Sequence, residues 1–151
     1  MLTGQEILLV IAVVLVYGAI RMLPRLIVGF NAYWSPARVK QAIEDGESIC
    51  LLDVRTPAEF AAEPGHIPGA INVPLNELQG RLERDGAFRE YRNSLVITVC
   101  RTDARAAFAT WVLKRHGFTR PRVISGGISA WIEDGLPITQ ETIPDEDEML
   151  R

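Results

Sequence analysis

The chain has 151 residues, of which 48% are hydrophobic, and this length allows one domain of ordinary size plus an appendage. Its formal net charge of -3 gives no general attraction to nucleic acid, so no nucleic-acid partner is expected. The two cysteines, Cys50 and Cys100, stand in unlike contexts and do not form the pattern of a secreted disulfide framework, which favours a reducing compartment.

The chain opens with an apolar segment. Residues 7–20 carry no charge, and the run reaches 17 residues, a short membrane span, if it is extended to residue 23 with Arg21 snorkelling. No Lys or Arg precedes it and no small-x-small cleavage site follows, so residues 7–23 are predicted to be a retained membrane anchor. A cleaved signal peptide and a buried core helix are the alternatives.

The charges around this segment predict its orientation. Arg21 and Arg25 follow the apolar run, so the positive-inside rule places the domain in the cytoplasm, held by a single pass through the inner membrane. Pro24 and the mixed stretch 25–34 predict a chain that lies along the membrane interface before the domain begins. The expected division is therefore an anchor with its juxtamembrane segment over 1–30, a domain over 31–139 and an acidic disordered tail over 140–151.

Between residues 31 and 139, strand-like runs alternate with helical ones. The expected elements are, in order, a helix from Ser35-Pro36 to Asp45-Gly46, a buried strand over 49–54, a short helix opened by the capping box Thr56 to Glu59, a turn with a short strand over 66–74, short helices around Gly80 and Gly86, a strand over 94–99, a helix over 104–118 ended by Gly117, a strand and loop over 122–127, and a last helix over 128–135. This alternation predicts an α/β domain whose central parallel sheet has helices on both faces.

Cys100 stands between a predicted strand and a predicted helix, within the sequence TVCRTDAR. In such folds the backbone N–H groups of the loop and the helix dipole favour an anion at this place. Arg101 and Arg105 add positive charge, so the sequence predicts a thiol pKa below its ordinary value. Cys50 lies in mid-strand between apolar neighbours and is interpreted as a structural residue.

Three separate blocks, LLDVRTPAEFAAEPGHIPGAINVP, VITVCRTDARAAFATWVLKRHGF and VISGGISAWIEDGLPI, resemble a single rhodanese domain over residues 35–139, preceded by a membrane anchor. The resemblance implies a rhodanese-like fold with Cys100 as the nucleophile. That cysteine would take sulfane sulfur from a small donor, thiosulfate or a persulfide, and pass it to a thiol, a protein acceptor or cyanide. Neither a cofactor nor a metal is expected, because the cysteines and histidines are too scattered to form a metal site.

The same resemblance assigns roles to the residues around Cys100. The loop residues would bind the substrate, and Asp53 and Arg55 would support the loop; the expected binding residues are Arg101, Thr102, Asp103, Ala104 and Arg105. Independently of the resemblance, Gly126 and Gly127 are expected to support the loop by letting the backbone approach it closely. The spacing Cys-x4-Arg favours sulfur transfer over the related phosphatases and arsenate reductases, whose loops are associated with one residue more.

Two loop positions depart from the family pattern. Asp103 stands where the family commonly has Gly, and Ala106 stands where it commonly has Ser. A carboxylate beside an anion site works against thiosulfate, although Asp103 could instead pair with Arg101 or with a basic group on a protein partner. In either case thiosulfate is predicted to be a poor substrate. The departure also leaves open a catalytically inactive domain that acts as a membrane-tethered binding module.

Two further residues are given structural interpretations. Glu59 is explained by the capping box that it forms with Thr56. His66 is not expected to act as a general base, because a turn histidine usually hydrogen-bonds the backbone.

Overall fold

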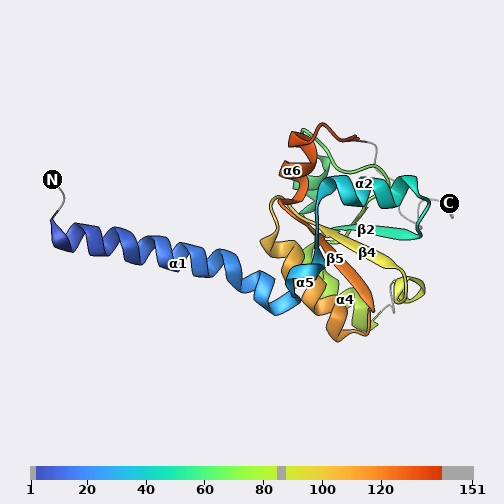
Figure 1. The fold of residues 1–151 in the computed structure, drawn as a ribbon. Helices are drawn as coiled ribbons and strands as arrows, with labels where there is room; N and C mark the ends of the chain where they lie inside the picture. The colour runs from blue at the N-terminus through green and yellow to red at the C-terminus, as the bar shows by residue number, and fades with distance from the viewer. Residues whose placement is uncertain (1–2, 85–87, 141–151) are drawn as a thin grey trace.

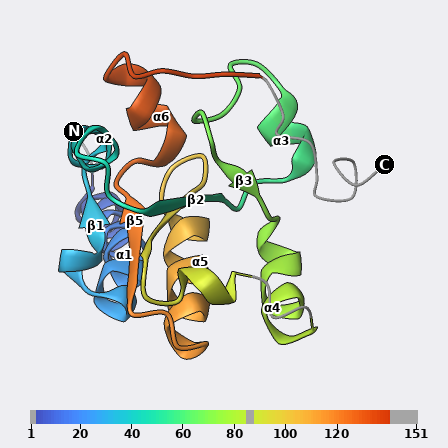
Figure 2. The same ribbon diagram turned by 90° about the vertical axis from the view of Figure 1, so that its right-hand side faces the viewer.

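The computed structural model describes residues 3–84 and 88–140, and its centre is a parallel sheet with the strand order β1-β5-β4-β2-β3, in which Figure 1 labels β5, β4 and β2 and Figure 2 labels the edge strands β1 and β3. The strands are β1 Tyr33–Trp34, β2 Ile49–Asp53, β3 Ile71–Asn72, β4 Leu95–Val99 and β5 Arg120–Ile124. The α-helices are α1 Gly4–Val28, α2 Pro36–Glu44, α3 Pro57–Ala61, α4 Leu75–Arg84, α5 Ala104–Arg115 and α6 Gly127–Glu133, and the 3-10 turns are η1 Phe30–Ala32 and η2 Arg89–Tyr91.

Helices cover both faces of the sheet, as expected (Figure 2). One buried cluster joins the sheet to α4, α5 and the end of α1, and the other joins it to α2, α3 and α6. Alternate residues of β4 and the residue after it serve the two faces: Ile97 and Val99 belong to the second cluster, whereas Val96 and the following Cys100 belong to the first. The sheet therefore lies between two apolar layers, as a fully buried parallel sheet must.

Local signals account for several of the element boundaries. The Ser35 side chain accepts a hydrogen bond from the Arg38 N–H and caps α2, whose first residue is Pro36. Thr56 and Glu59 form the expected reciprocal capping box at the start of α3. Residue 80 lies inside one continuous helix, α4, whereas residue 86 is outside the described residues. The acidic tail predicted over 140–151 is also outside them from residue 141 onward.

The predicted interfacial stretch 25–34 is wrong in one respect, because Tyr33 and Trp34 belong to the sheet. They pair in parallel with Val123 and Ile124 of β5 and so extend the sheet by one strand. A two-residue edge strand has too little pattern to be recognised in the sequence. The helix before it continues through Pro24 to Val28, and Val28 is buried against the domain.

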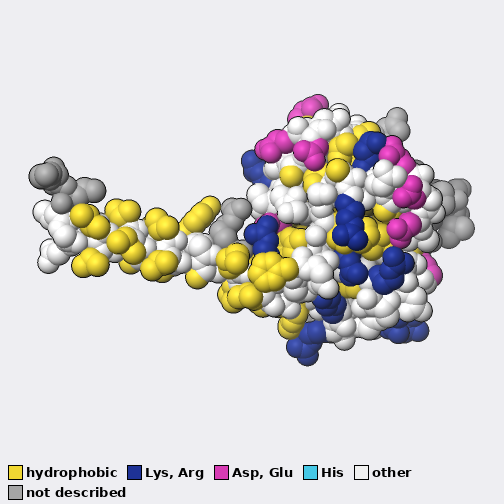
Figure 3. Space-filling model, viewed as in Figure 1, with side chains coloured by type: hydrophobic (Ala, Val, Ile, Leu, Met, Phe, Trp, Pro, Cys, Tyr) yellow, Lys and Arg dark blue, Asp and Glu magenta, His cyan; other side chains and the backbone are white. Residues whose placement is uncertain are grey.

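The remainder of α1 projects away from the domain (Figures 1 and 3). This helix is long and apolar enough to cross a membrane: its most apolar window has a mean hydropathy of 2.4 and is 0% buried against the rest of the chain. Apolar side chains are exposed all around it, from Ile7 to Ile27. The predicted apolar segment is thus a helix whose side chains the domain does not cover.

Candidate active site

Cys100 follows β4 directly, at the carboxyl edge of the sheet. Its side chain is 1% exposed, and its Sγ accepts a hydrogen bond from the Ala106 N–H at 3.4 Å. The backbone N–H groups of Thr102 and Arg105 also favour the thiolate form of Cys100. The sulfur therefore lies where the N–H groups of the loop and the first turn of α5 converge.

The predicted low thiol pKa is wrong for the free protein. Burial raises the pKa of the Cys100 thiol above its ordinary value, although the Ala106 and Thr102 N–H groups and the Arg105 charge oppose this effect. Loss of water around the sulfur outweighs these favourable contacts. The burial of a loop residue cannot be read from a sequence motif, which explains the error.

The two arginines of the loop are not equivalent. Arg105 belongs to the first turn of α5, and its charge lowers the pKa of Cys100. Arg101 is exposed and is not among the groups that shift this pKa. The expectation that both arginines favour the thiolate is thus met by Arg105 alone.

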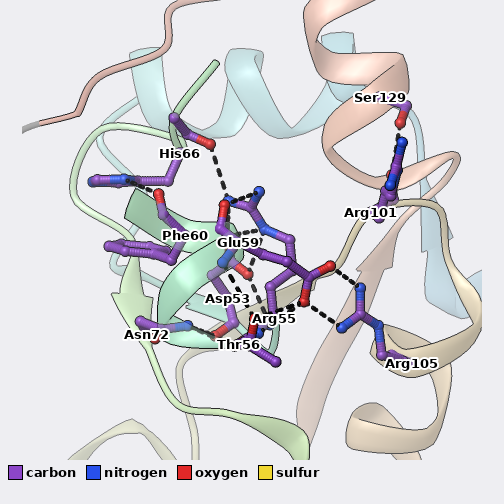
Figure 4. Close-up of polar contacts among 11 residues, drawn as sticks. Asp53, Arg55, Thr56, Glu59, Phe60, His66, Asn72, Arg101, Arg105 and Ser129 are labelled. Atoms are coloured by element: carbon purple, nitrogen blue, oxygen red, sulfur yellow. Dashed lines mark hydrogen bonds and ion pairs between the residues drawn. The ribbon is translucent and has the colours of Figure 1, made fainter. Parts of the chain in front are cut away.

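Arg105 is held by Glu59 of α3, a contact that sequence reasoning missed. Its two terminal nitrogens donate to the two carboxylate oxygens at 2.8 and 2.7 Å (Figure 4). The hydrogen bonds from Arg105 and Thr56 lower the pKa of Glu59 to about 2. Glu59 therefore has a second role besides its capping box, and the capping pattern in the sequence concealed it.

Asp53 and Arg55 form a buried ion pair at the end of β2, with three contacts of 2.7 to 3.0 Å between Arg55 side-chain nitrogens and Asp53 carboxylate oxygens. Arg55 also donates to the carbonyl oxygens of Glu59 and Gly65 (Figure 4). The pair thus supports α3 and the segment after it. It is also linked to the Cys100 loop, because Arg55 binds the Glu59 carbonyl and the Glu59 carboxylate binds Arg105.

The start of α6 lies against the other side of the loop. The Ile128 N–H donates to the Cys100 carbonyl at 2.8 Å, and both the N–H and the hydroxyl of Ser129 donate to the Arg101 carbonyl. A Cβ on Gly127 would lie 2.1 Å from the Thr102 carbonyl oxygen, so only glycine fits there. Gly126 adopts a positive φ of 74° just before the helix. Sequence reasoning anticipated the glycines but not the Ser129 contact.

The remaining loop residues differ in their surroundings. Thr102 and Ala104 are exposed at the surface. The Asp103 carboxylate lies against Arg25 of α1, at 3.4 Å, and not against Arg101. The two residues are 78 positions apart, so no local pattern could have indicated this contact.

His66 and Cys50 are both buried, and their contacts suit a structural role. His66 is buried, stacks on Phe60 with ring centroids 3.6 Å apart and contacts the Phe60 carbonyl through Nδ1. Cys50 is buried in mid-strand, where desolvation raises the pKa of its thiol to about 12. Within residues 3–84 and 88–140, no three His, Cys, Asp or Glu side chains form a group that could hold a metal ion.

An open hollow of about 350 Å³ lies beside Arg105. Thr56 from the start of α3, Leu75 from the start of α4 and Phe108 from α5 line it together with Arg105. Its walls are mainly apolar, whereas Arg105 gives it one polar side next to the Cys100 loop.

A buried thiol that accepts backbone N–H groups, at the carboxyl edge of a parallel sheet with helices on both faces, characterises this α/β domain. The family model for the rhodanese-like domain matches residues 35–134, and the chain belongs to this family. The expected fold is confirmed: the parallel sheet with helices on both faces is the rhodanese fold.

Relatives and solved structures agree with this assignment. A sulfurtransferase of Allochromatium vinosum is 36% identical over 100 residues, which cover 66% of this chain and 87% of that protein. Thiosulfate sulfurtransferase 16, chloroplastic, of Arabidopsis thaliana is 41% identical over 93 residues, with coverages of 57% and 76%. The human single-domain sulfurtransferase structure matches with a TM-score of 0.59 at 27% identity, covering 68% of this chain and 96% of that one. These relatives support sulfur transfer as the general class of activity.

Proposed function

We propose that the domain is a sulfane-sulfur transferase that carries sulfur as a persulfide on Cys100. The proposal rests on one observation: the Cys100 Sγ accepts a hydrogen bond from the Ala106 N–H, at the point where the N–H donors of the loop converge. A thiolate, or the terminal sulfur of a persulfide, gains hydrogen bonds there that a neutral thiol gains more weakly. The names of the sulfurtransferase relatives agree with this chemistry.

The reaction proceeds in two displacements. The Cys100 thiolate attacks the sulfane sulfur of the donor, the donor S–S bond breaks, and the leaving group departs with the electron pair; for thiosulfate that group is sulfite. A thiolate of the acceptor, or cyanide, then attacks the terminal sulfur of the persulfide. The S–S bond to Cys100 breaks, and Cys100 leaves as a thiolate, ready for another donor.

The surrounding residues bind and orient the sulfur. The N–H groups of Thr102, Arg105 and Ala106 stabilise the thiolate, and Arg105 supplies the nearest positive charge acting on it. Thr102 and Ala104 lie at the surface of the loop, where a donor approaches. The Glu59 carboxylate fixes Arg105 and so orients this charge.

Mass spectrometry of the intact protein tests the proposal. After incubation with thiosulfate or a persulfide donor, Cys100 should gain one sulfur, about 32 Da. Cys100→Ser should abolish this gain, whereas Cys50→Ser, which changes the matched buried thiol on β2, should leave it intact. Failure of every donor to load Cys100 would contradict sulfur transfer.

A second candidate, a binding module without turnover, is favoured by one observation. Burial raises the pKa of the Cys100 thiol, so less of it is thiolate at neutral pH than in a typical low-pKa cysteine site. A protein whose Cys100 stays unmodified by every donor would support this module. A phosphatase or arsenate reductase activity is less favoured because the loop from Cys100 to Arg105 is short for a tetrahedral phosphate.

We also propose that α1 anchors the domain to the inner membrane, with the domain on the cytoplasmic side. The exposed apolar side chains of α1 and the arginines that follow them support this orientation. A reporter fused after residue 151 should be active only as a cytoplasmic reporter. Activity of a periplasmic reporter at the same position would contradict it.

A further inference from the structure

Asp103 occupies the position before the first turn of α5 but does not cap that helix. Aspartate at this position ordinarily accepts a hydrogen bond from the N–H of the second or third helical residue. Asp103 makes no such bond, and its carboxylate turns instead toward Arg25, with an oxygen to nitrogen distance of 3.4 Å.

One of the two N–H groups that a capping Asp103 could take is already in use, and the other, on Arg105, also favours the Cys100 thiolate. The third residue of α5 is Ala106, and its N–H points at the Cys100 Sγ, 3.4 Å away. A capping carboxylate and the Cys100 sulfur would therefore compete for one donor. Two negative groups at that donor would also repel each other.

Arg25 is held in place by the packing of α1 on α5. Its guanidinium lies 4.9 Å from the centroid of the Tyr33 ring. One turn further along α1, the Val28 carbonyl accepts a hydrogen bond from Lys114 of α5 at 2.6 Å, and the Val28 side chain is buried in the core. The side chains of Arg25 and Asp103 are only 28% and 16% exposed, so water screens their attraction incompletely.

We propose that Arg25 is a positioning residue for the Cys100 loop: it holds the Asp103 carboxylate away from the start of α5 and so reserves the Ala106 N–H for sulfur. The helix that carries the apolar anchor thereby completes the loop, and it offsets the acidic residue that replaces the usual glycine. The inference rests on the proposed sulfur-transfer function for its substrate but not for its geometry.

A double-mutant cycle on the full chain in detergent micelles tests this inference. Arg25→Gln frees the Asp103 carboxylate, so it should raise the thiol pKa of Cys100 and slow its alkylation by neutral iodoacetamide about threefold to tenfold at neutral pH. In thiosulfate turnover, the KM should rise by a similar factor, with a smaller change in kcat. Arg25→Lys, which keeps the charge, should restore most of the rate.

The Asp103→Ala variant distinguishes positioning from a general charge effect. Alanine cannot cap the helix or compete for the Ala106 N–H, so Arg25→Gln should have less than about a twofold effect in the Asp103→Ala background. The matched control is Arg115→Gln, because Arg115 also lies over an aromatic ring, Trp111, at 5.0 Å, but at the far end of α5. It should change the alkylation rate by less than about twofold.

The cycle separates failure of this inference from failure of the proposed function. Equal effects of Arg25→Gln with and without the Asp103 carboxylate, or an effect no larger than that of Arg115→Gln, would overturn the inference. Alkylation rates do not require sulfur transfer, so a coupled cycle in a protein that no donor loads would retain the inference and reject the function. A circular dichroism spectrum unchanged from the wild type excludes unfolding as the cause of any rate change.

Discussion

Cys50 lies on β2 and Cys100 directly follows the neighbouring strand β4; both belong to the same buried cluster, but their local backbone differs. Cys50 is within β2, opposite Val96, where the backbone N–H and C=O groups form the hydrogen bonds between paired strands. Cys100 stands one residue beyond β4, where loop N–H groups are free to point at sulfur. Burial raises the thiol pKa at both sites, but only at Cys100 do N–H donors and a positive charge oppose the rise. Backbone donors, rather than burial, therefore distinguish the candidate site from its neighbour.

The two regions around these cysteines are also held together differently. The centre of the sheet around Cys50 packs through apolar contacts such as those of Leu52 and Val96. The carboxyl edge around Cys100 depends on buried polar contacts and on close backbone approach, as in the Asp53 to Arg55 ion pair and at Gly127. Substitutions at the carboxyl edge should therefore be poorly tolerated.

The largest effect is expected from breaking the buried ion pair at the carboxyl edge. Asp53→Asn leaves the buried guanidinium of Arg55 without its counter-charge and should lower the free energy of unfolding by about 3–5 kcal/mol. Urea denaturation measures the change. Glu47→Gln is the matched control, because it breaks an exposed ion pair with Arg120 and should cost less than about 1 kcal/mol. Equal losses in the two variants would contradict a special role for the edge.

Gly127→Ala should have the next largest effect. The new Cβ would meet the carbonyl oxygens of Thr102 and Cys100 at 2.1 and 2.4 Å, so the loop must move. The free energy of unfolding should fall by about 2–4 kcal/mol, and sulfur loading of Cys100 should fall with it. Both are measurable on one preparation, by denaturation and by mass spectrometry.

Gly69→Ala is the control for backbone conformation alone. Gly69 also has a positive φ, 80°, but its added Cβ would meet no atom within 4 Å. The substitution should cost only about 1–2 kcal/mol and leave loading intact. If the Gly127 variant lost no more stability than this one and kept its loading, the close approach to the loop would have no consequence.

The sequence predicted the elements at the centre of the sheet better than the contacts at its carboxyl edge. Apolar runs, caps and turn residues are local signals, so the strand Ile49–Asp53 and the helix Pro36–Glu44 appear close to their expected bounds. Strand β1 was missed because two residues, Tyr33 and Trp34, carry no recognisable period, and their place is set by pairing with β5.

At the edge, residue types were more predictable than contacts. The motif indicated Cys100 and Arg105, whose roles in catalysis remain predictions. It could not indicate the Arg105 to Glu59 bonds or the Arg25 to Asp103 pair, because each joins residues that only the fold brings together. The sign of the Cys100 pKa shift was wrong for a related reason: desolvation depends on everything packed around the sulfur.

A smaller effect should separate the two arginines of the loop. Arg105→Gln removes a charge that lowers the pKa of the Cys100 thiol, so this pKa should rise and alkylation at neutral pH should slow by about tenfold. The pH profile of the alkylation rate measures the shift directly. Arg101→Gln, in the same loop but with an exposed side chain, should shift the profile by less than about 0.3 units. A larger shift from Arg101→Gln would restore the original expectation for both arginines.

The smallest effect concerns the centre of the sheet and its stability in alkali. Folding raises the pKa of Cys50 from 9.0 to about 12, so the folded state keeps a proton that the unfolded state releases. The contribution of Cys50 to stability is thus fully present below pH 9 and is lost as the pH rises toward 12. Between about pH 8 and about pH 10 the wild type should lose roughly 1 kcal/mol through this group.

Cys100 acts in the same direction, because its pKa is also raised, so the informative quantity is the difference between the wild type and Cys50→Ala. Urea denaturation at the two pH values should show a steeper loss in the wild type than in the variant. Parallel losses in the two proteins would mean that the thiol at the centre of the sheet is not shielded from titration, and the contrast between the two cysteines would then rest on the Cys100 loop alone.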